Sequence, residues 1–367
     1  MPGASLRSVT DHPAGPSGRQ RAFLVDAVPA GPLLDRVRRA RQRGVVPDVI
    51  LGDVLVGEGP RDALDPVDVT PDELGQLVDG GRRLPRWVVE KGSFGPGYVQ
   101  LKALMRQEGL VTVCEEAACP NIQRCWTRGT ATFMIAGDTC TRGCRFCDVT
   151  SGKPMLPPDP AEPGRLAEAA AAMGLRYVVV TAVARDDQPD GGAAHFAAVI
   201  RALRDRLPDA RVEVLIPDLR GNWDALEMVI EARPDVLNHN TETVPRLYRR
   251  VRPGARYERS LELLERSRAA GLPTKSGIMV GLGEELPEIR AVFSDLAQSG
   301  CEVVTVGQYL SPSPQHLPVE RFYAPAEYPA LAALGESLGL VHVEAGPLVR
   351  SSFEADRVAD QMGAGVV

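Results

Sequence analysis

The chain has 367 residues, of which 44% are hydrophobic and 25% charged, the composition of a globular protein with a substantial core. The formal net charge of −6 at pH 7 gives no basic footprint for nucleic-acid binding. No apolar run approaches the roughly 20 residues of a membrane-spanning helix, and residues 1–20 lack the apolar stretch of a secretory signal. We therefore expect a cytoplasmic protein that has neither nucleic acid nor a membrane as a partner.

The first 130 residues give few signals of secondary structure. Residues 1–20 are rich in Gly, Pro and Ser and are predicted to be disordered, while 33–44 has the pattern of a short basic amphipathic helix. Residues 45–57 favour one or two short strands, and 97–110 favours a helix. Thr70, Pro71, Glu73 and Gly80 form the start and stop pattern of a helix over 70–81. No catalytic pattern falls within residues 1–80.

Beyond residue 130, strand and helix patterns alternate. The predicted strands are short apolar runs rich in Val and Ile, at 131–137, 176–183, 211–217, 235–240, 274–282, 302–310 and 340–346. The predicted helices occupy 165–174, 193–207, 223–232, 260–271, 285–300 and 326–339. This alternation is typical of an α/β fold, either a barrel or a doubly wound sheet, with ligands at the carboxyl ends of the strands. We expect these loops to share one rim: 140–147, 184–192, 238–243, 281–285 and 308–314.

Six of the seven cysteines lie between residues 113 and 149, in two groups of three. The first group has the spacing C-x4-C-x5-C and the second the spacing C-x3-C-x2-C; the six residues are Cys114, Cys119, Cys125, Cys140, Cys144 and Cys147. A disulfide framework is not expected in a reducing compartment. Structural zinc needs four ligands, which four of the six could supply, and a C-x2-C pair could serve thiol redox chemistry. The best fit is a four-iron cluster that takes three thiolates and leaves one iron open to a substrate.

The second cysteine group, in the loop after the first strand of a β/α fold, resembles that of the radical S-adenosylmethionine (SAM) enzymes. The flanking sequence from about 83 to 357 resembles the lipoyl synthase family, on segments that include VCEEAACPNIQRCW, RGTATFMIAGDTCTRGCRFCDV, DDQPDGGAAHF, VLIPD, PTKSGIMVGLGE and GPLVRSSFEAD. The resemblance implies an α/β fold with a partial (β/α)6-type barrel, an N-terminal extension that carries an auxiliary cluster, and a C-terminal tail that closes over it. The expected divisions are 1–20, 21–82 (of unknown role), 83–130 (auxiliary cluster), 131–346 (barrel) and 347–367 (tail).

The resemblance also implies an activity. It is that of a radical SAM sulfurtransferase that inserts two sulfur atoms at C6 and C8 of an octanoyl group, which is carried on a lysine of a lipoyl carrier domain. The implied cofactors are two 4Fe-4S clusters and S-adenosyl-L-methionine. The implied partners are a carrier of the E2-subunit or glycine cleavage H-protein type and an electron donor such as ferredoxin or flavodoxin. The alternatives are a radical SAM paralogue with another substrate and a non-catalytic β/α protein with structural zinc.

The resemblance assigns the site residues as well. The radical cluster is expected on Cys140, Cys144 and Cys147. The auxiliary cluster, which is the sulfur source, is expected on Cys114, Cys119 and Cys125 together with Ser352 of the RSS motif. Contacts with S-adenosylmethionine are expected from a GLGE turn and from the end of a strand, at Gly281, Gly283, Glu284, Asn240 and Glu242.

Other conspicuous residues have simpler interpretations. His239 is predicted to be a hydrogen-bonded structural residue and Cys301 a buried apolar one. The polar group at 185–187 is predicted to be solvated. The basic run is interpreted first as a solvated face and second as a docking site for an acidic carrier; it consists of Arg246, Arg249, Arg250, Arg252 and Arg256. Lys275 is interpreted equally as a site residue or as one partner of a carboxylate.

Three residues depart from the family pattern. Phe353 and Glu354 stand where the family typically has Tyr and His, and Ala184 stands where it has Asp. Because all six cluster cysteines and Ser352 are present, we expect the cluster chemistry to be preserved. The departures bear on substrate recognition and on the geometry around Ser352.

Overall fold

The computed structural model describes residues 132–362 continuously and, before them, short stretches between residues 49 and 125. The disorder predicted at 1–20 and the helix predicted at 33–44 lie outside the described residues. Strands β1 (Val49–Ile50) and β2 (Asp53–Val54) pair in an antiparallel hairpin, which confirms the strands predicted in 45–57. The helix predicted over 70–81 is wrong at its end, because β3 (Val78–Asp79) pairs with β4 (Arg82–Arg83).

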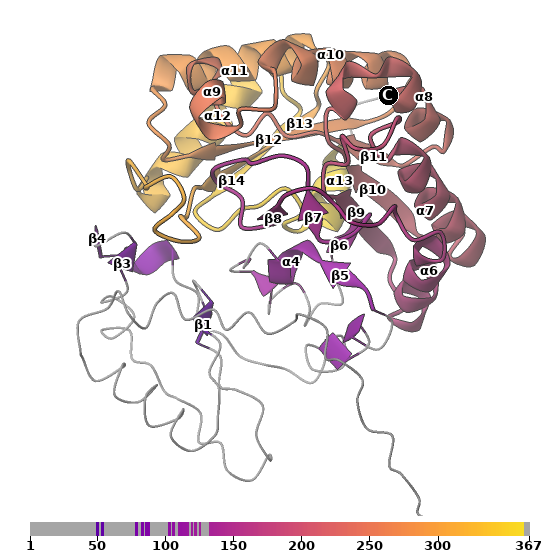
Figure 1. Ribbon diagram of the computed structural model, residues 1–367. Coiled ribbons are helices and arrows are strands. Elements are labelled where there is room, and N and C mark those ends of the chain that lie inside the picture. Colours follow the sequence, from indigo (N-terminus) through magenta and orange to yellow (C-terminus); the bar gives the residue numbers. More distant parts are fainter. Residues whose placement is uncertain are drawn as a thin grey trace, which may run out of the picture.

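An eight-stranded sheet forms the centre of the described region (Figure 1). Its strands are β5 (Val111–Thr112), β6 (Thr132–Ile135), β9 (Tyr177–Ala182), β10 (Arg211–Leu215), β11 (Val236–Asn238), β12 (Thr274–Val280), β13 (Val303–Gln308) and β14 (His342–Gly346). All neighbours pair in parallel except β5, which is antiparallel to β6. The strands follow one another in chain order, as in a barrel, whereas a doubly wound sheet reverses its order at a switch point. Because β14 and β5 are the two edges, the barrel is partial.

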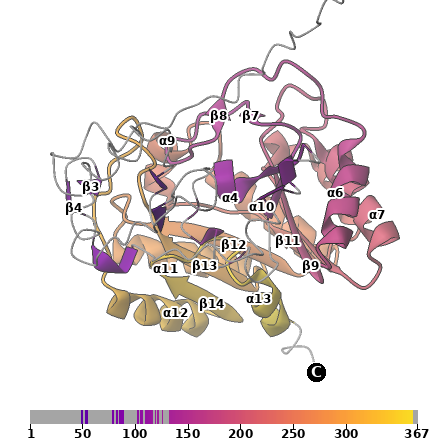
Figure 2. The same ribbon diagram turned by 90° about the horizontal axis from the view of Figure 1, so that it is seen from below.

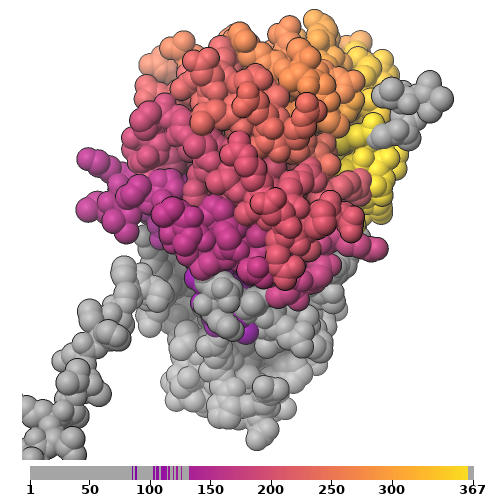
Figure 3. Space-filling model, turned by 90° about the vertical axis from the view of Figure 1, so that its right-hand side faces the viewer, coloured from indigo at the N-terminus to yellow at the C-terminus, as the bar shows by residue number. Residues whose placement is uncertain are grey.

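Helices cover the outer face of this sheet, and Figure 1 shows them as an arc around the strands. They are α6 (Glu162–Ala172), α7 (Ala193–Arg206), α8 (Trp223–Glu231), α10 (Tyr257–Ala269), α11 (Leu286–Gln298) and α12 (Tyr328–Ser337). The helices pack on the sheet through one apolar face each. In α11, the buried residues recur at helical spacing and form such a stripe, at Ile289, Val292, Phe293 and Leu296. In the space-filling view, the coloured part of the chain forms one continuous body (Figure 3).

Helix α13 (Ala355–Met362) lies apart from the outer layer, on the inner side of the sheet (Figures 1 and 2). Its buried face packs against inward-facing residues at the beginnings of the strands, namely Tyr177, Val179, Val236 and Val303. The guanidinium of Arg211 binds the carboxylate of Asp360 at 2.8 Å and lies 5.0 Å from the Tyr177 ring. Helix α13 therefore lies inside the amino-terminal end of the barrel.

A buried polar network crosses the interior above α13. Lys275 Nζ lies 3.0 Å from Glu213 Oε1, and the two residues are 1% and 0% exposed. Asn238 Nδ2 donates to Glu213 Oε1 at 3.0 Å and the Tyr177 hydroxyl donates to Glu213 Oε2 at 2.7 Å. Lys275 is thus the partner of a carboxylate, and the network joins four adjacent strands, β9 to β12.

Candidate functional site

The second cysteine group lies in a loop that crosses the carboxyl ends of the strands. After β6 the backbone turns through Ala136 (φ 65°) and Gly137 (φ 99°), and Cys140 then ends β7 (Thr139–Cys140). Strand β7 pairs in parallel with β8 (Thr150–Ser151), so this two-residue ladder closes the loop that carries Cys144 and Cys147. All three thiols are half-buried.

Main-chain hydrogen bonds dock this loop on three later segments of the chain. Thr141 N donates to Ala184 O at 3.0 Å, after β9, and Arg145 N donates to Val251 O at 2.9 Å, in α9 (Tyr248–Val251). Leu317 N donates to Arg145 O at 3.2 Å. Thr141 Oγ1 also donates to Ala184 O, at 2.9 Å, and Ala184 N donates to Cys140 Sγ. Because all three contacts use the Ala184 backbone, this docking does not need the Asp side chain that the family has here.

The thiols have the surroundings of iron–sulfur ligands. The backbone N–H groups of Ala184 and Arg142 donate to Cys140 Sγ at 3.3 and 3.4 Å, and such bonds to sulfur tune cluster potentials. Burial raises the pKa of Cys144 to about 11, with the charge of Arg252 opposing it, and burial raises the pKa of Cys147 to about 12. Cluster binding must therefore displace protons from these thiols.

The donor set of this loop consists of three thiolates, the usual ligands of iron–sulfur clusters. Within the described residues, no three His, Cys, Asp or Glu side chains converge as ligands of one metal ion. A four-iron cluster binds each thiolate through a different iron, so its ligands stand apart from one another. Three cysteines on one docked loop fit that requirement.

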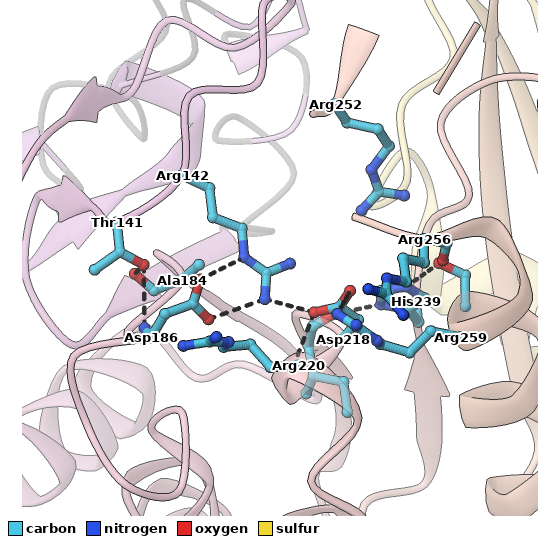
Figure 4. A network of polar contacts seen from close by, with 12 residues as sticks. Thr141, Arg142, Ala184, Asp186, Asp218, Arg220, His239, Arg252, Arg256 and Arg259 are labelled. Carbon is cyan, nitrogen blue, oxygen red and sulfur yellow. Dashed lines mark hydrogen bonds and ion pairs between the residues drawn. The ribbon is translucent and has the colours of Figure 1, made fainter. Parts of the chain in front are cut away.

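A buried charge network anchors the cysteine loop from within (Figure 4). Arg142, between Cys140 and Cys144, binds Asp186 through Nε at 2.8 Å and Asp218 through Nη2 at 2.5 Å. Arg259 holds the other oxygen of Asp218 at 3.1 Å. Burial raises the pKa of Asp218, but the charge and hydrogen bond of Arg142, together with the charge of His239 and the Arg220 N–H, hold the pKa at about 2. The carboxylate therefore stays charged and fixes the loop to the ends of β9 and β10.

Asn240 and Glu242 lie together at the end of β11, with Arg252 beside them. Asn240 Nδ2 donates to Glu242 Oε1 at 3.1 Å, and Arg252 Nη1 donates to Asn240 O at 2.7 Å. Burial raises the pKa of Glu242, and the charge of Arg252 opposes this shift. Glu242 has φ 65° and bridges to Ile278 of β12, so a left-handed residue turns the chain back onto the sheet. The charges of Glu242 and Arg252 both act on the pKa of Cys144.

The GLGE turn closes on itself. Glu284 accepts hydrogen bonds from the backbone of Gly281 at 2.6 Å and of Leu282 at 2.9 Å, and a third from the Tyr323 hydroxyl at 2.9 Å. Gly281 and Gly283 both have φ 104°, where a side chain would be strained. The carboxylate of Glu284 thus shapes the turn at the end of β12, and its contact with S-adenosylmethionine stays a prediction.

The first cysteine group meets the C-terminal RSS segment. Cys114 lies in α4 (Val113–Glu116), and Cys119 and Cys125 are half-buried. Asn121, between the last two, donates through Nδ2 to Leu348 O at 2.5 Å. Burial lowers the pKa of Arg350 and the charge of Cys119 opposes that shift, so these two groups interact. The contacts bring together segments more than 200 residues apart in sequence.

Several interpretations from the sequence can be compared with these positions. His239 is 1% exposed and bonds Ile216 O at 2.8 Å and Ser260 Oγ at 2.9 Å, so its structural role is confirmed, as is the burial of Cys301. The solvated interpretation of 185–187 is wrong for Arg185, which is 2% exposed and donates to Ala136 O and Leu156 O. In the basic run, Arg252 is buried, whereas its four companions are exposed.

Sequence reasoning missed Arg142, Asp218 and Arg252 as residues that shape the site. Arg142 stands inside the CTRGC motif and Asp218 ends VLIPD, so both were within segments already singled out. The sequence does not show that Arg142 pairs with Asp218, because the two residues are more than 70 positions apart in the chain.

Comparisons with known proteins show the family to which this chain is similar. A model of the Radical SAM superfamily matches residues 134–296. A lipoyl synthase of Methylococcus capsulatus is 56% identical over 284 residues, covering 77% of this chain and 88% of that protein. Those of Nitrosococcus oceani and Mycobacterium ulcerans are 54% and 52% identical, each covering 76% of this chain and 86% of the relative.

The similarity to solved structures is weaker. Methylornithine synthase aligns with a TM-score of 0.44 at 12% identity, over 69% of this chain and 79% of that one, too low a score to add to the fold described above. Within the described residues, none of the helices has the length and apolar character needed to cross a lipid bilayer.

Proposed function

This chain belongs to the lipoyl synthase family and is a radical SAM sulfur-inserting enzyme, and from that premise we propose which of its residues perform the reaction. Its substrate is a lipoyl carrier, whose octanoyl group receives sulfur at C6 and C8. Two 4Fe-4S clusters and S-adenosyl-L-methionine supply the radical and the sulfur when they are bound.

Cys140, Cys144 and Cys147 hold the radical cluster in this proposal. The main-chain docking of their loop and the buried Arg142–Asp218 pair support it, because a loop fixed in this way presents three thiolates in a constant arrangement. S-adenosylmethionine lies toward Asn240 and Glu242, which bond each other at the end of β11, and toward the turn that contains Gly281, Gly283 and Glu284. The side chains position the reactants and exclude water, and no general base is needed at an unactivated carbon.

Cys114, Cys119, Cys125 and Ser352 hold the auxiliary cluster. The observation that supports this assignment is the hydrogen bond from Asn121 to Leu348 O, which docks the first cysteine group on the segment that contains Ser352. A serine oxygen is a weaker ligand for iron than a thiolate, which suits a cluster that must give up its sulfur. The functional divisions are then 83–130 for this cluster, 131–346 for the barrel and 347–367 for the tail.

We also propose which types of carrier and electron donor the enzyme uses. The carrier is of the E2-subunit or glycine cleavage H-protein type, and the electron donor is a ferredoxin or flavodoxin. We place the reaction in the cytoplasm, because six clustered cysteines that bind metal favour a compartment that keeps thiols reduced.

Anaerobic turnover with an octanoyl-lysyl carrier peptide tests the proposal. The expected product is heavier by two inserted sulfur atoms, and the enzyme should contain about eight irons. Cys144→Ala should abolish 5′-deoxyadenosine formation, whereas Cys119→Ala should keep it and make no lipoyl product. A peptide left unchanged by an enzyme that is active toward another octanoyl acceptor would favour the paralogue, for which Phe353 and Glu354 are the motivating departures.

A further inference from the structure

The RSS segment lies directly on the backbone of the sheet. After β14 the chain crosses the end of β13, where Gln308 N donates to Pro347 O at 3.2 Å. A Cβ atom at Gly307 would collide with Val349 O, so only glycine lets the segment approach so closely. The beginning of this segment, residues 347–349, is therefore held closely against the end of β13.

Two asparagines hold this segment from opposite sides. Asn121, which is 2% exposed and belongs to the first cysteine group, donates to Leu348 O at 2.5 Å. Asn240, at the end of β11, donates through Nδ2 to Ser351 Oγ at 2.6 Å. Asn240 can reach this position because it lies over Gly277, where a Cβ atom would come within 2.9 Å of Asn240 Oδ1.

These contacts distinguish two adjacent serines. The Ser351 hydroxyl is engaged by Asn240, whereas the Ser352 hydroxyl makes no hydrogen bond within the described part of the chain. Both side chains are half-buried. Because the neighbouring hydroxyl of Ser351 is fixed, Ser352 has a defined place, and none of the described residues engages its oxygen.

We propose that Asn121, Asn240 and Ser351 form a latch that positions Ser352 for the auxiliary cluster, with Ser351 as a positioning residue and not a ligand. The inference rests on the proposed function, since that cluster is what Ser352 serves. A weak oxygen ligand gains most from such positioning, because the chain is ordered before the ligand binds. The latch also joins the two halves of the site, since Asn121 comes from the auxiliary-cluster segment and Asn240 from the barrel.

Hydrogen exchange of the metal-free full chain tests the latch without using activity. The reporter is the peptide 346–354, whose amides at Val349 and Phe353 bond Gly346 O and Arg350 O. Asn121→Leu and Ser351→Ala should each speed its exchange roughly tenfold, the effect of losing about one buried hydrogen bond. Ser351→Thr keeps the hydroxyl and should restore slow exchange. Wild-type exchange rates in both Asn121→Leu and Ser351→Ala would overturn the latch.

Matched controls separate the latch from general destabilisation. Asn222→Leu removes an asparagine bond to Pro189 O and also the cap that Asn222 Oδ1 provides for Ala225 N at the start of α8. Ser337→Ala removes a serine bond to Leu334 O, and both sites are in the outer layer. Neither should change the exchange of 346–354. Peptides from β10 and β12 should exchange at wild-type rates in every variant, which shows that the barrel is folded.

The reconstituted enzyme gives a second readout. Ser351→Ala should lose the iron of the auxiliary cluster to a chelator roughly tenfold faster, while 5′-deoxyadenosine formation continues. Equal rates of iron loss in Ser351→Ala and wild type would also contradict the latch. A wild-type enzyme that makes no sulfur-containing product would instead refute the proposed function, and the exchange data would still decide the latch.

Discussion

At the scale of single residues, the site is surrounded by buried polar groups whose partners lie on other elements. The sequence singles out the cysteines by their local spacing and Ser352 by the resemblance of the RSS motif, and both assignments stay predictions. The role of Arg252 could not, since its partner is a backbone carbonyl of Asn240, and no side-chain pattern marks such a contact. The same limit explains Arg185, whose acceptors are carbonyls at residues 136 and 156.

His239 should make the stability of the metal-free protein depend on pH. Burial, with the charge of Arg252, lowers its pKa from 6.5 to about 4, so between these values the unfolded chain binds a proton that the folded chain does not. Stability should therefore fall by about 3 kcal/mol as the pH drops from 6.5 to 4. Urea unfolding at several pH values should show this fall in the free energy of unfolding in wild type and not in His239→Gln. His342→Gln, on the edge strand β14, is the control and should keep the slope.

At the scale of elements, the sequence predicts the barrel well. Each Val-rich run forms a strand; β9, for example, spans 177–182 where the sequence predicts 176–183. The prediction succeeds because continuous apolar runs are typical of strands that are buried on both faces. Strands β7 and β8 have two residues each, too few for any periodicity. Helix α13 was missed for a different reason: its buried stripe is short and includes two alanines, Ala355 and Ala359.

Helix α13 should contribute measurably to stability through its packed face. Val358 is 2% exposed and packs in the cluster with Val303, so Val358→Ala should cost about 2 kcal/mol of unfolding free energy. Arg357 is the neighbouring control; its side chain is 65% exposed and pairs with Glu354, and Arg357→Ala should cost less than about 0.5 kcal/mol. Chemical denaturation measures both, and equal effects would show that the inner packing does not hold the tail.

At the scale of the whole molecule, the interior of the barrel is polar where many barrels are filled with apolar layers. The network of Lys275, Glu213, Asn238 and Tyr177 ties four strands together beneath the site. Burial and the Glu213 charge raise the pKa of Tyr177, so its hydroxyl remains a donor. The sequence showed each of these residues inside a strand, but only the register of the parallel sheet brings them together.

Removing one charge of the Lys275–Glu213 pair should strongly lower the stability of the folded protein. Lys275→Met leaves the Glu213 carboxylate buried without its cation and should destabilise the protein by about 3–5 kcal/mol. Adding Glu213→Gln removes the stranded charge and keeps acceptors for Asn238 and Tyr177, so the double variant should lie closer to wild type. Denaturation midpoints of the two single variants and the double variant give the coupling. Additive effects would show that the pair is not coupled.

The docking of the cysteine loop also bears on how such an enzyme survives oxygen damage. The loop is fixed by main-chain bonds to Ala184 and Val251 and by the Arg142–Asp218 pair, none of which depends on iron. An enzyme whose radical cluster has been destroyed by air would then keep its thiols in place, if they stay reduced. Repair would then consist of binding a new cluster to cysteines that are already in place, without any need for the barrel to refold.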